Sequence, residues 1–192
     1  IRGTSTPFVS NGLNSDRIPG TERHLISLQY SDSAFLGQEL VGQVYYRDES
    51  LRFYPFPTVN ANKQVTAFSS SQQDTDQYGM KLTLNSKPMD GWQITWGLDA
   101  DHERFTSNQM FFDLAQASAS GGLNNKKIYT TGRYPSYDIT NLAAFLQSGY
   151  DINNLFTLNG GVRYQYTENK IDDFIGYAQQ RQIAAGKATS AD

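Results

Sequence analysis

Six stretches of the chain alternate apolar and polar side chains with a period of two, which predicts β-strands with one apolar face. They cover residues 24–30, 39–47, 77–85, 92–101, 139–150 and 156–167. The alternation is strictest in residues 92–101, where the even-numbered residues from Trp92 to Ala100 are apolar and the odd-numbered ones are polar or Gly. Residues 139–150 are partly apolar on both faces, which leaves the orientation of that strand open.

Short and long connections alternate between the predicted strands. The short connections cover residues 31–37, 86–91 and 151–154, and the long ones cover residues 48–72, 105–138 and the stretch beyond 167. The long loops should therefore all emerge on the same side of the sheet. Structureless loops longer than about 12–15 residues are uncommon in compact soluble domains unless they carry a function.

The strand length and the placement of the aromatic residues favour a transmembrane β-barrel. A strand of about ten residues is about 33 Å long, and a tilt of ~45° turns this into a depth of about 23 Å. Aromatic residues gather near both strand ends, as in the two interfacial girdles of such barrels. Those near the short turns are Tyr30, Phe35, Trp92, Tyr150 and Phe156. Those near the long loops are Tyr45, Tyr46, Tyr78, Phe105, Tyr164 and Tyr166.

A soluble β-sandwich remains an alternative, because it also alternates apolar and polar faces. Six strands are fewer than the roughly eight of the smallest closed outer-membrane barrels. We therefore predict an all-β fold, an antiparallel transmembrane β-barrel present as a partial segment of about six strands. The chain starts at Ile1 without Met or an apolar signal region, so we expect a mature or shortened chain.

Composition and charge narrow the classes of function. The net charge is −3 with no basic block, so nucleic acid is not an expected partner. The chain has no Cys, which excludes disulfides and thiolate metal sites. His24 and His102 share no metal-ligand spacing and accompany no recognisable nucleophile motif. We expect neither a metal site nor an enzyme.

Four strand and turn segments resemble the TonB-dependent siderophore receptors. Residues 141–147 (NLAAFLQ), 155–158 and 160–164 (GGVRY) resemble a strand–turn–strand unit of that family, and residues 30–37 (YSDSAFLG) are similar to its periplasmic turns. Two loop sequences, 52–58 (RFYPFPT) and 176–181 (GYAQQR), narrow the resemblance to one receptor of the family whose siderophore is built on citrate and hydroxamates. The resemblance runs over the whole chain.

The resemblance implies a Gram-negative outer-membrane receptor that imports a ferric siderophore with energy from the TonB system. It implies that residues 1–192 are one fragment of a barrel domain, since the N-terminal plug, the TonB box and the closing C-terminal strands are not found in the sequence. Expected partners are the ferric siderophore, TonB through the plug, and outer-membrane lipid or lipopolysaccharide, with a bacteriocin or phage as a further candidate. No covalent cofactor is expected. The alternatives are a passive porin-like channel and a soluble β-rich binding module.

An anionic ferric siderophore calls for Arg or Lys beside aromatic walls, because its iron already has oxygen ligands. The first candidate cluster is Arg52, Phe53, Tyr54 and Phe56. The second lies in the longest loop and consists of Lys126, Lys127, Tyr129, Arg133, Tyr134 and Tyr137, with Arg133 favoured over the lysines. The alternative is that the rings pack loop against loop and that the lysines are only solvated or pair with lipopolysaccharide phosphates.

Two further features complete the expectations. Met110, Leu114 and Ala117 have helical spacing between a capping Ser107-Asn108 and a terminating Gly121-Gly122, which predicts a short helix in the loop. The charged residues predicted to face the barrel lumen are Lys81, Asp99, Asp101 and Arg163. We interpret them as a polar wall that is solvated or internally paired.

Overall fold

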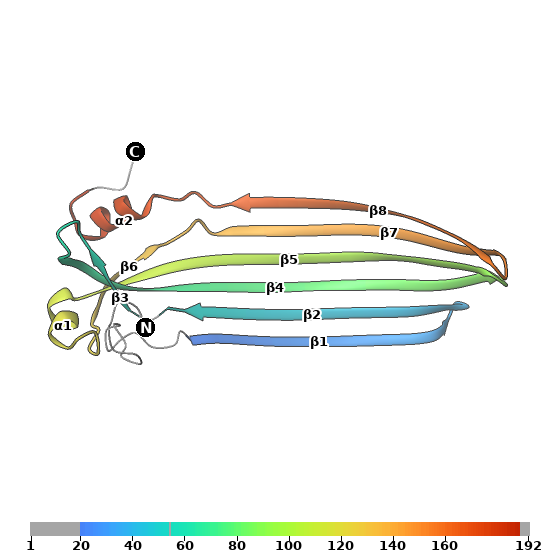
Figure 1. Ribbon diagram of the computed structural model, residues 1–192, viewed down its shortest axis with the longest axis horizontal. Coiled ribbons are helices and arrows are strands. Elements are labelled where there is room, and N and C mark those ends of the chain that lie inside the picture. Colours follow the sequence, from blue (N-terminus) through green and yellow to red (C-terminus); the bar gives the residue numbers. More distant parts are fainter. Residues whose placement is uncertain (1–19, 54, 189–192) are drawn as a thin grey trace.

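The computed structural model describes residues 20–53 and 55–188 of the chain. Six long antiparallel strands form one curved sheet in the order β1-β2-β4-β5-β7-β8, so that each strand pairs with its neighbours in sequence (Figure 1). The strands are β1 (Gly20–Phe35), β2 (Gln38–Arg52), β4 (Val65–Met89), β5 (Trp92–Phe112), β7 (Tyr137–Asn153) and β8 (Phe156–Ile171). The predicted antiparallel all-β fold is confirmed, although β4 and β5 reach 25 and 21 residues and are far longer than the alternation indicated.

Tight turns close the three hairpins at one end of the sheet, and the loops and helices lie at the other end (Figure 1). The β1–β2 turn places Leu36 at φ 49° and Gly37 at φ 78°, and Gly91 has φ 74° in the β4–β5 turn. Positive φ at these positions suits the tight turns that match the twist of paired strands. The Asn153 carboxamide oxygen accepts from the Leu155 N–H at 2.9 Å in the third turn. The three short connections are thus confirmed.

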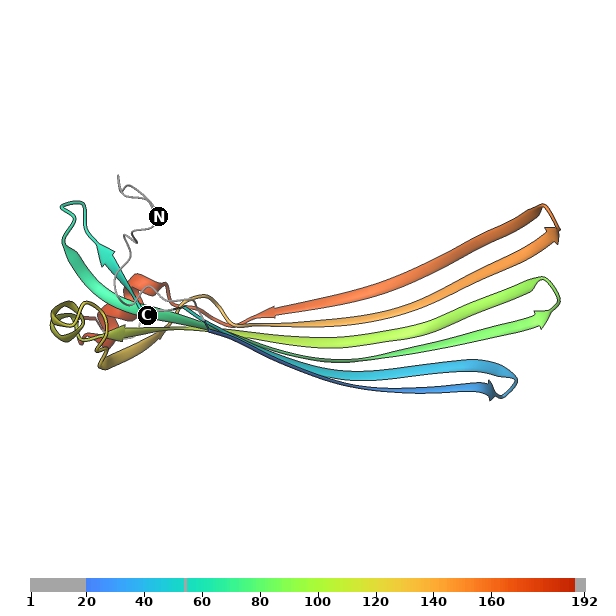
Figure 2. The same ribbon diagram turned by 60° about the horizontal axis from the view of Figure 1, so that its bottom comes forward.

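The register gathers the apolar side chains onto one face. Apart from the register shifts beside the three turns, even-numbered residues of the long strands pair with even-numbered residues, so they share a face that we call the outer face. One row across the sheet consists of Leu28, Val44, Met80, Ala100, Leu142 and Tyr166. Trp96, Leu98 and Leu158 on this face are 38%, 41% and 65% exposed, with no second layer of described chain over the strands (Figure 2). A soluble module would seal such a surface in a core, whereas a barrel wall presents it to lipid.

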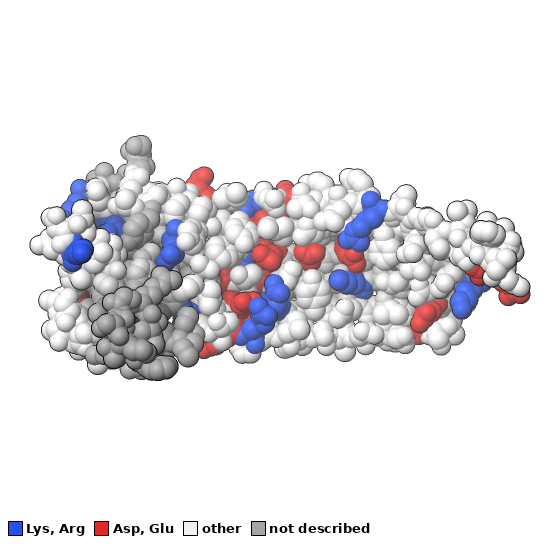
Figure 3. All heavy atoms as spheres, viewed as in Figure 1, with Lys and Arg blue, Asp and Glu red and all other residues white. Residues whose placement is uncertain are grey.

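The odd-numbered residues form the opposite, inner face, which is polar. The predicted lumen-facing charges lie here, and several are paired within the wall. Arg163 reaches across β7 to Asp99, with 2.8 Å between guanidinium nitrogen and carboxylate oxygen. The Asn141 amide donates to Asp101 at 2.9 Å and accepts from the Thr167 hydroxyl at 2.7 Å. The charged side chains form separate groups along the molecule, with uncharged surface between them (Figure 3).

Two of the predicted girdle residues face inward instead. Tyr45 pairs with Ser27 and Gly79, and its ring covers Gly79 so closely that a Cβ there would lie 2.7 Å from it. Phe105 pairs with Thr75 and Tyr137 on the same inner face. A place near a strand end does not fix the direction of a side chain, because successive residues point to opposite faces. The loop-side outer aromatics are Tyr46, Tyr78, Tyr164 and Tyr166.

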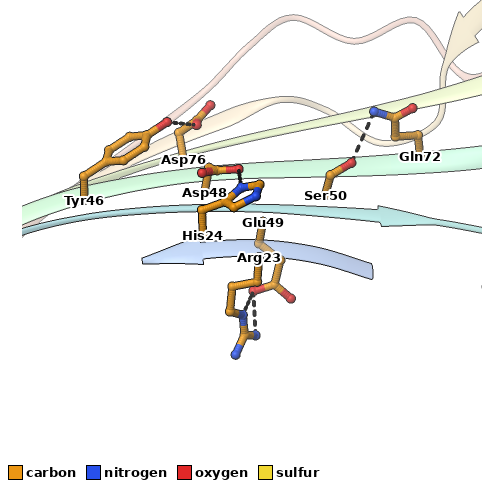
Figure 4. A network of polar contacts seen from close by, with 8 residues as sticks. All are labelled: Arg23, His24, Tyr46, Asp48, Glu49, Ser50, Gln72 and Asp76. Carbon is orange, nitrogen blue, oxygen red and sulfur yellow. Dashed lines mark hydrogen bonds and ion pairs between the residues drawn. The ribbon is translucent and has the colours of Figure 1, made fainter. Parts of the chain in front are cut away.

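A charged row crosses the outer face where its apolar surface ends on the loop side. It consists of His24, Asp48, Asp76, Arg104, Asp138 and Lys170. Arg104 pairs with Asp138 at 2.8 Å, and His24 pairs with Asp48 at 3.0 Å. Figure 4 shows the His24–Asp48 pair on one side of the strands and the Arg23–Glu49 pair on the other. No helix in the described part of the chain is long and apolar enough to cross a membrane.

The two faces generate a test by substitution in the full-length protein. Leu82→Arg places a charge among the outer-face residues Gly42, Leu98 and Ala144, and should cost about 2–4 kcal/mol near the bilayer centre. Lys81→Ala, on the inner face one residue away, should be mild. Membrane assembly can be followed by heat-modifiable gel mobility, and equal tolerance at both positions would contradict the assigned faces.

Candidate functional site

The loop ends of β4 and β5 continue beyond the charged row, where two further short strands of the same sheet pair with them; we call this extension the small sheet. β3 (Phe56–Val59) pairs with β4, and β6 (Lys127–Gly132) pairs with β5. Two short helices, α1 (Leu114–Ala119) and α2 (Tyr177–Ala184), accompany this sheet at the same end of the molecule (Figure 1). Residues 48–72 and 105–138, predicted as long loops, therefore contain strand ends, β3, α1 and β6. Much of the two predicted loops is thus strand, because β4 and β5 extend into them and β3 and β6 form backbone hydrogen bonds with these extensions.

Local side-chain hydrogen bonds explain the β3–β4 turn. The Asn60 carboxamide oxygen accepts from the N–H groups of Asn62 and Gln64 at 3.0 Å and 2.9 Å. Lys63 adopts φ 60° between them. An Asn side chain that holds nearby backbone N–H groups in this way favours a turn over continued strand.

The predicted loop helix exists but begins later than expected. The carboxylate of Asp113 caps α1 by accepting from the Gln116 N–H at 2.9 Å. The helix ends where Gly122 donates to the Ala117 carbonyl at 2.7 Å, with Gly121 and Gly122 both at positive φ. The predicted end is confirmed. The predicted cap at 107–108 is wrong, because residues 107–112 pair with β4 and most of them also pair with β6.

The small sheet and α1 contain the most deeply buried apolar side chains of the described chain. Phe68, Phe111 and Ala117 are 3%, 1% and 0% exposed. Phe111 stacks on Tyr129 with 4.7 Å between ring centroids, and the Arg181 guanidinium of α2 lies 5.2 Å from the centroid of the Phe111 ring. This packing gives the loop end a core of its own, which the open sheet of the barrel wall lacks.

Hydrogen bonds of the Gln180 side chain hold α2 against β6. Its side-chain oxygen accepts from the Gly132 N–H at 2.6 Å, and its side-chain nitrogen donates to the Ile175 carbonyl. A Cβ at Gly132 would lie 3.0 Å from the Phe174 ring, so glycine permits this close approach. A hollow of 490 Å³ lies between β6 and the α2 segment, lined by residues that include Thr130, Phe174 and Ile183.

The first predicted cluster follows the loop end of β4. Arg52 is the last residue of β2 and lies opposite Gln72. As an even-numbered residue of the strand, it belongs to the outer face. The N–H of Phe53 donates to the Ser71 carbonyl at 2.9 Å, and Phe56 pairs with Ser69 in β3. Tyr54 lies outside the described residues. The cluster is thus extended along one strand and is not gathered around a single cavity.

The second predicted cluster is divided between packing and the barrel mouth. Tyr129 packs on Phe111, as described above. The N–H of Arg133 donates to the Ser107 carbonyl at 3.0 Å, and its guanidinium lies 5.3 Å from the centroid of the Tyr134 ring. Tyr137 begins β7 on the inner face and stacks on Phe105 with 4.8 Å between centroids. Lys126 and Lys127 are exposed beside the start of β6.

Three inner-face residues near Tyr137 belong to neither of the two predicted clusters. Phe105 forms the other half of the aromatic stack, Glu103 lies one row nearer the turns, and Arg47 lies in the same row as Glu103. Burial, together with the Glu103 carboxylate, raises the pKa of the Tyr137 hydroxyl. Only the cross-strand register, which the sequence does not supply, brings these residues together.

The described residues contain no group of three or more His, Asp or Glu side chains that could hold a metal ion. Instead, the loop end offers arginines beside stacked aromatic rings, on strands that continue directly into an apolar-coated wall. This arrangement suits recognition of an anionic, partly apolar ligand.

The chain belongs to the family of TonB-dependent receptor-like β-barrels, whose family model matches residues 2–190. It is a segment of an outer-membrane receptor barrel, a class that consists of receptors and transporters, not enzymes.

Two curated relatives make the comparison more specific. The chain is 98% identical over 192 residues to the ferric aerobactin receptor of Escherichia coli, covering 100% of this chain and 26% of that protein. It is 43% identical over 182 residues to the rhizobactin receptor of Rhizobium meliloti (strain 1021), covering 95% of this chain and 24% of that receptor. The chain therefore spans about a quarter of the length of these relatives. The resemblance inferred from the sequence is confirmed.

Gln180→Leu should release α2 from β6 in the full-length receptor. The substitution removes both hydrogen bonds of the side chain, each worth about 1 kcal/mol, so residues 173–187 should be cleaved several-fold faster by added protease on intact cells. Gln179→Leu is the matched control, because Gln179 is the preceding residue and its side chain is exposed. Equal cleavage rates in the two variants would contradict the anchoring role of Gln180.

Proposed function

We propose that the receptor containing this chain imports ferric aerobactin across the outer membrane with energy from the TonB system. The observation that carries the proposal is the 98% identity to the ferric aerobactin receptor over the whole chain. Support comes also from the barrel-wall architecture, with its lipid-compatible outer face and ordered loop end. Family membership disfavours a passive porin-like channel.

The chemistry of the cargo fits the side chains at the loop end. Ferric aerobactin is anionic, and its iron is coordinated by its own oxygens, so the receptor needs cations and flat apolar surfaces but no metal ligands. Arg133 beside Tyr134, and Tyr137 on Phe105, supply such groups. The described members of the first cluster, Arg52, Phe53 and Phe56, add a second aromatic and basic surface along β4.

We propose that residues 1–192 form one fragment of the barrel domain, completed by the remainder of the receptor. Among the described strands, β1 and β8 each pair on one side only. Open edges in a membrane carry unsatisfied backbone groups, so strands from elsewhere must pair with them. In this arrangement TonB acts through a plug outside the chain. Lipid and lipopolysaccharide meet the outer face, and a bacteriocin or phage would use the exposed loops.

Direct binding tests the proposal. The full-length receptor in outer membranes should bind ferric aerobactin and should import its iron only when TonB is present. Neutral ferric chelates of similar size should bind much more weakly, because they lack the anionic groups. Absence of ferric aerobactin binding to a correctly assembled receptor would refute the proposed function.

Arg133→Ala should weaken ferric aerobactin binding about tenfold, equivalent to about 1.4 kcal/mol, by removing a charge-assisted contact. Lys187→Ala removes an exposed charge at the same end of the molecule and serves as the control. Dissociation constants are compared at equal surface abundance. An unchanged affinity for Arg133→Ala would remove this residue from the proposed pocket.

A further inference from the structure

We propose that Arg47, on the inner face at the loop end of β2, binds an anionic group of the ferric siderophore as it enters the barrel. This inference rests on the proposed function and adds a residue outside both predicted loop clusters. Its basis is a mismatch on the inner wall: the acidic side chains near Arg47 have partners, whereas the buried Nε–H of Arg47 has no acceptor among the described residues.

The acidic side chains around Arg47 are already engaged. Arg23 reaches Glu49 at 2.6 Å, Arg163 reaches Asp99 at 2.8 Å, and the Asn141 amide donates to Asp101 at 2.9 Å. The Tyr137 hydroxyl is hydrogen-bonded to the remaining carboxylate, Glu103. The carboxylates of this part of the wall are thus satisfied within the wall itself.

Arg47 is different. Its cross-strand neighbours on β1 and β4 are Leu25 and Gln77, neither of which is charged. Its Nε–H is shielded from solvent and has no hydrogen-bond partner, and no ion pair among the described residues includes it. A shielded guanidinium N–H without an acceptor is unfavourable until an acceptor arrives. An entering carboxylate or hydroxamate oxygen would be such an acceptor.

Lys81 provides an internal comparison on the same face. It also lacks an ion pair within 4.0 Å among the described residues, but its cross-strand partner is the carboxylate residue Asp99. That carboxylate already pairs with Arg163, so the two cations differ in exposure: Lys81 is exposed to solvent, whereas the Nε–H of Arg47 is shielded and has no acceptor. This difference selects Arg47 as the anion-binding group of the wall.

The surroundings of Arg47 suit a ligand with an anionic side and an apolar body. The row above it on the loop side holds Glu49 on β2, which pairs with Arg23, then Thr75 on β4 and the Phe105–Tyr137 stack on β5 and β7. The guanidinium and the aromatic stack are thus separated by one strand with small or amide side chains. A siderophore can place its carboxylate on Arg47 and its body against the rings, since planar guanidinium groups bind carboxylates in a two-pronged geometry.

The test is ferric aerobactin binding to the full-length receptor with Arg47→Ala, Arg47→Lys and Arg23→Ala. Arg47→Ala should raise the Kd at least tenfold and reduce its dependence on salt, because one cation–anion contact is lost. Arg47→Lys should be intermediate, since it keeps the charge without the fork geometry. Arg23→Ala removes the same side chain from the same face, but its charge is already paired with Glu49. It should stay within twofold of wild type.

The outcomes separate this inference from the proposed function. Wild-type receptor that fails to bind ferric aerobactin overturns both. Wild-type binding with unchanged affinity in Arg47→Ala, or with an equal loss in Arg23→Ala, overturns the role of Arg47 alone. If Arg47→Ala does not assemble in the outer membrane, Arg47→Gln, which keeps a long polar side chain, is measured in its place with the same criteria.

Discussion

Cross-strand register is the constraint on which the rest of this structure depends. Backbone pairing matches even-numbered residues with even-numbered residues across six strands, from Leu28 on β1 to Tyr166 on β8. A slip of one residue in any hairpin would move an apolar row onto the polar face. The tight turns limit such slips, because positive φ at Gly37 and Gly91 fixes where the first two hairpins reverse.

The inner face reinforces the register by packing aromatic rings onto glycines. A Cβ at Gly97 would lie 2.3 Å from the Leu82 carbonyl oxygen and 2.7 Å from the Phe145 ring. Phe145 in turn lies beneath Arg163, whose guanidinium is 6.0 Å from the ring centroid and pairs with Asp99. Ring, glycine and ion pair join β5, β7 and β8 in one arrangement. A shifted strand would lose all three contacts together.

The strands and turns were predictable because their signals are local. A period of two identifies a strand wherever it occurs, and Asp90-Gly91 marks a turn without reference to the rest of the chain. The inward direction of Tyr45, the pairing of β3 and β6, and the start of α1 depend on partners distant in sequence. Dependence on partners distant in sequence also limited the prediction of the candidate site. Tyr137 was selected from its loop composition, whereas Arg47 and Phe105 stand out only after strands from different hairpins are aligned.

Continuity between wall and loops connects the fold to recognition. β4 and β5 run without interruption from the turns to the buried core around Phe68 and Phe111, and α2 is held on β6 through Gln180. Side chains at the loop end are therefore carried by strands that the membrane and the register already hold in place. Binding to such a surface loses less conformational entropy than binding to free loops, so more of the contact energy remains as affinity. Under the proposed function, the long hairpins thus make the barrel wall itself part of the recognition surface.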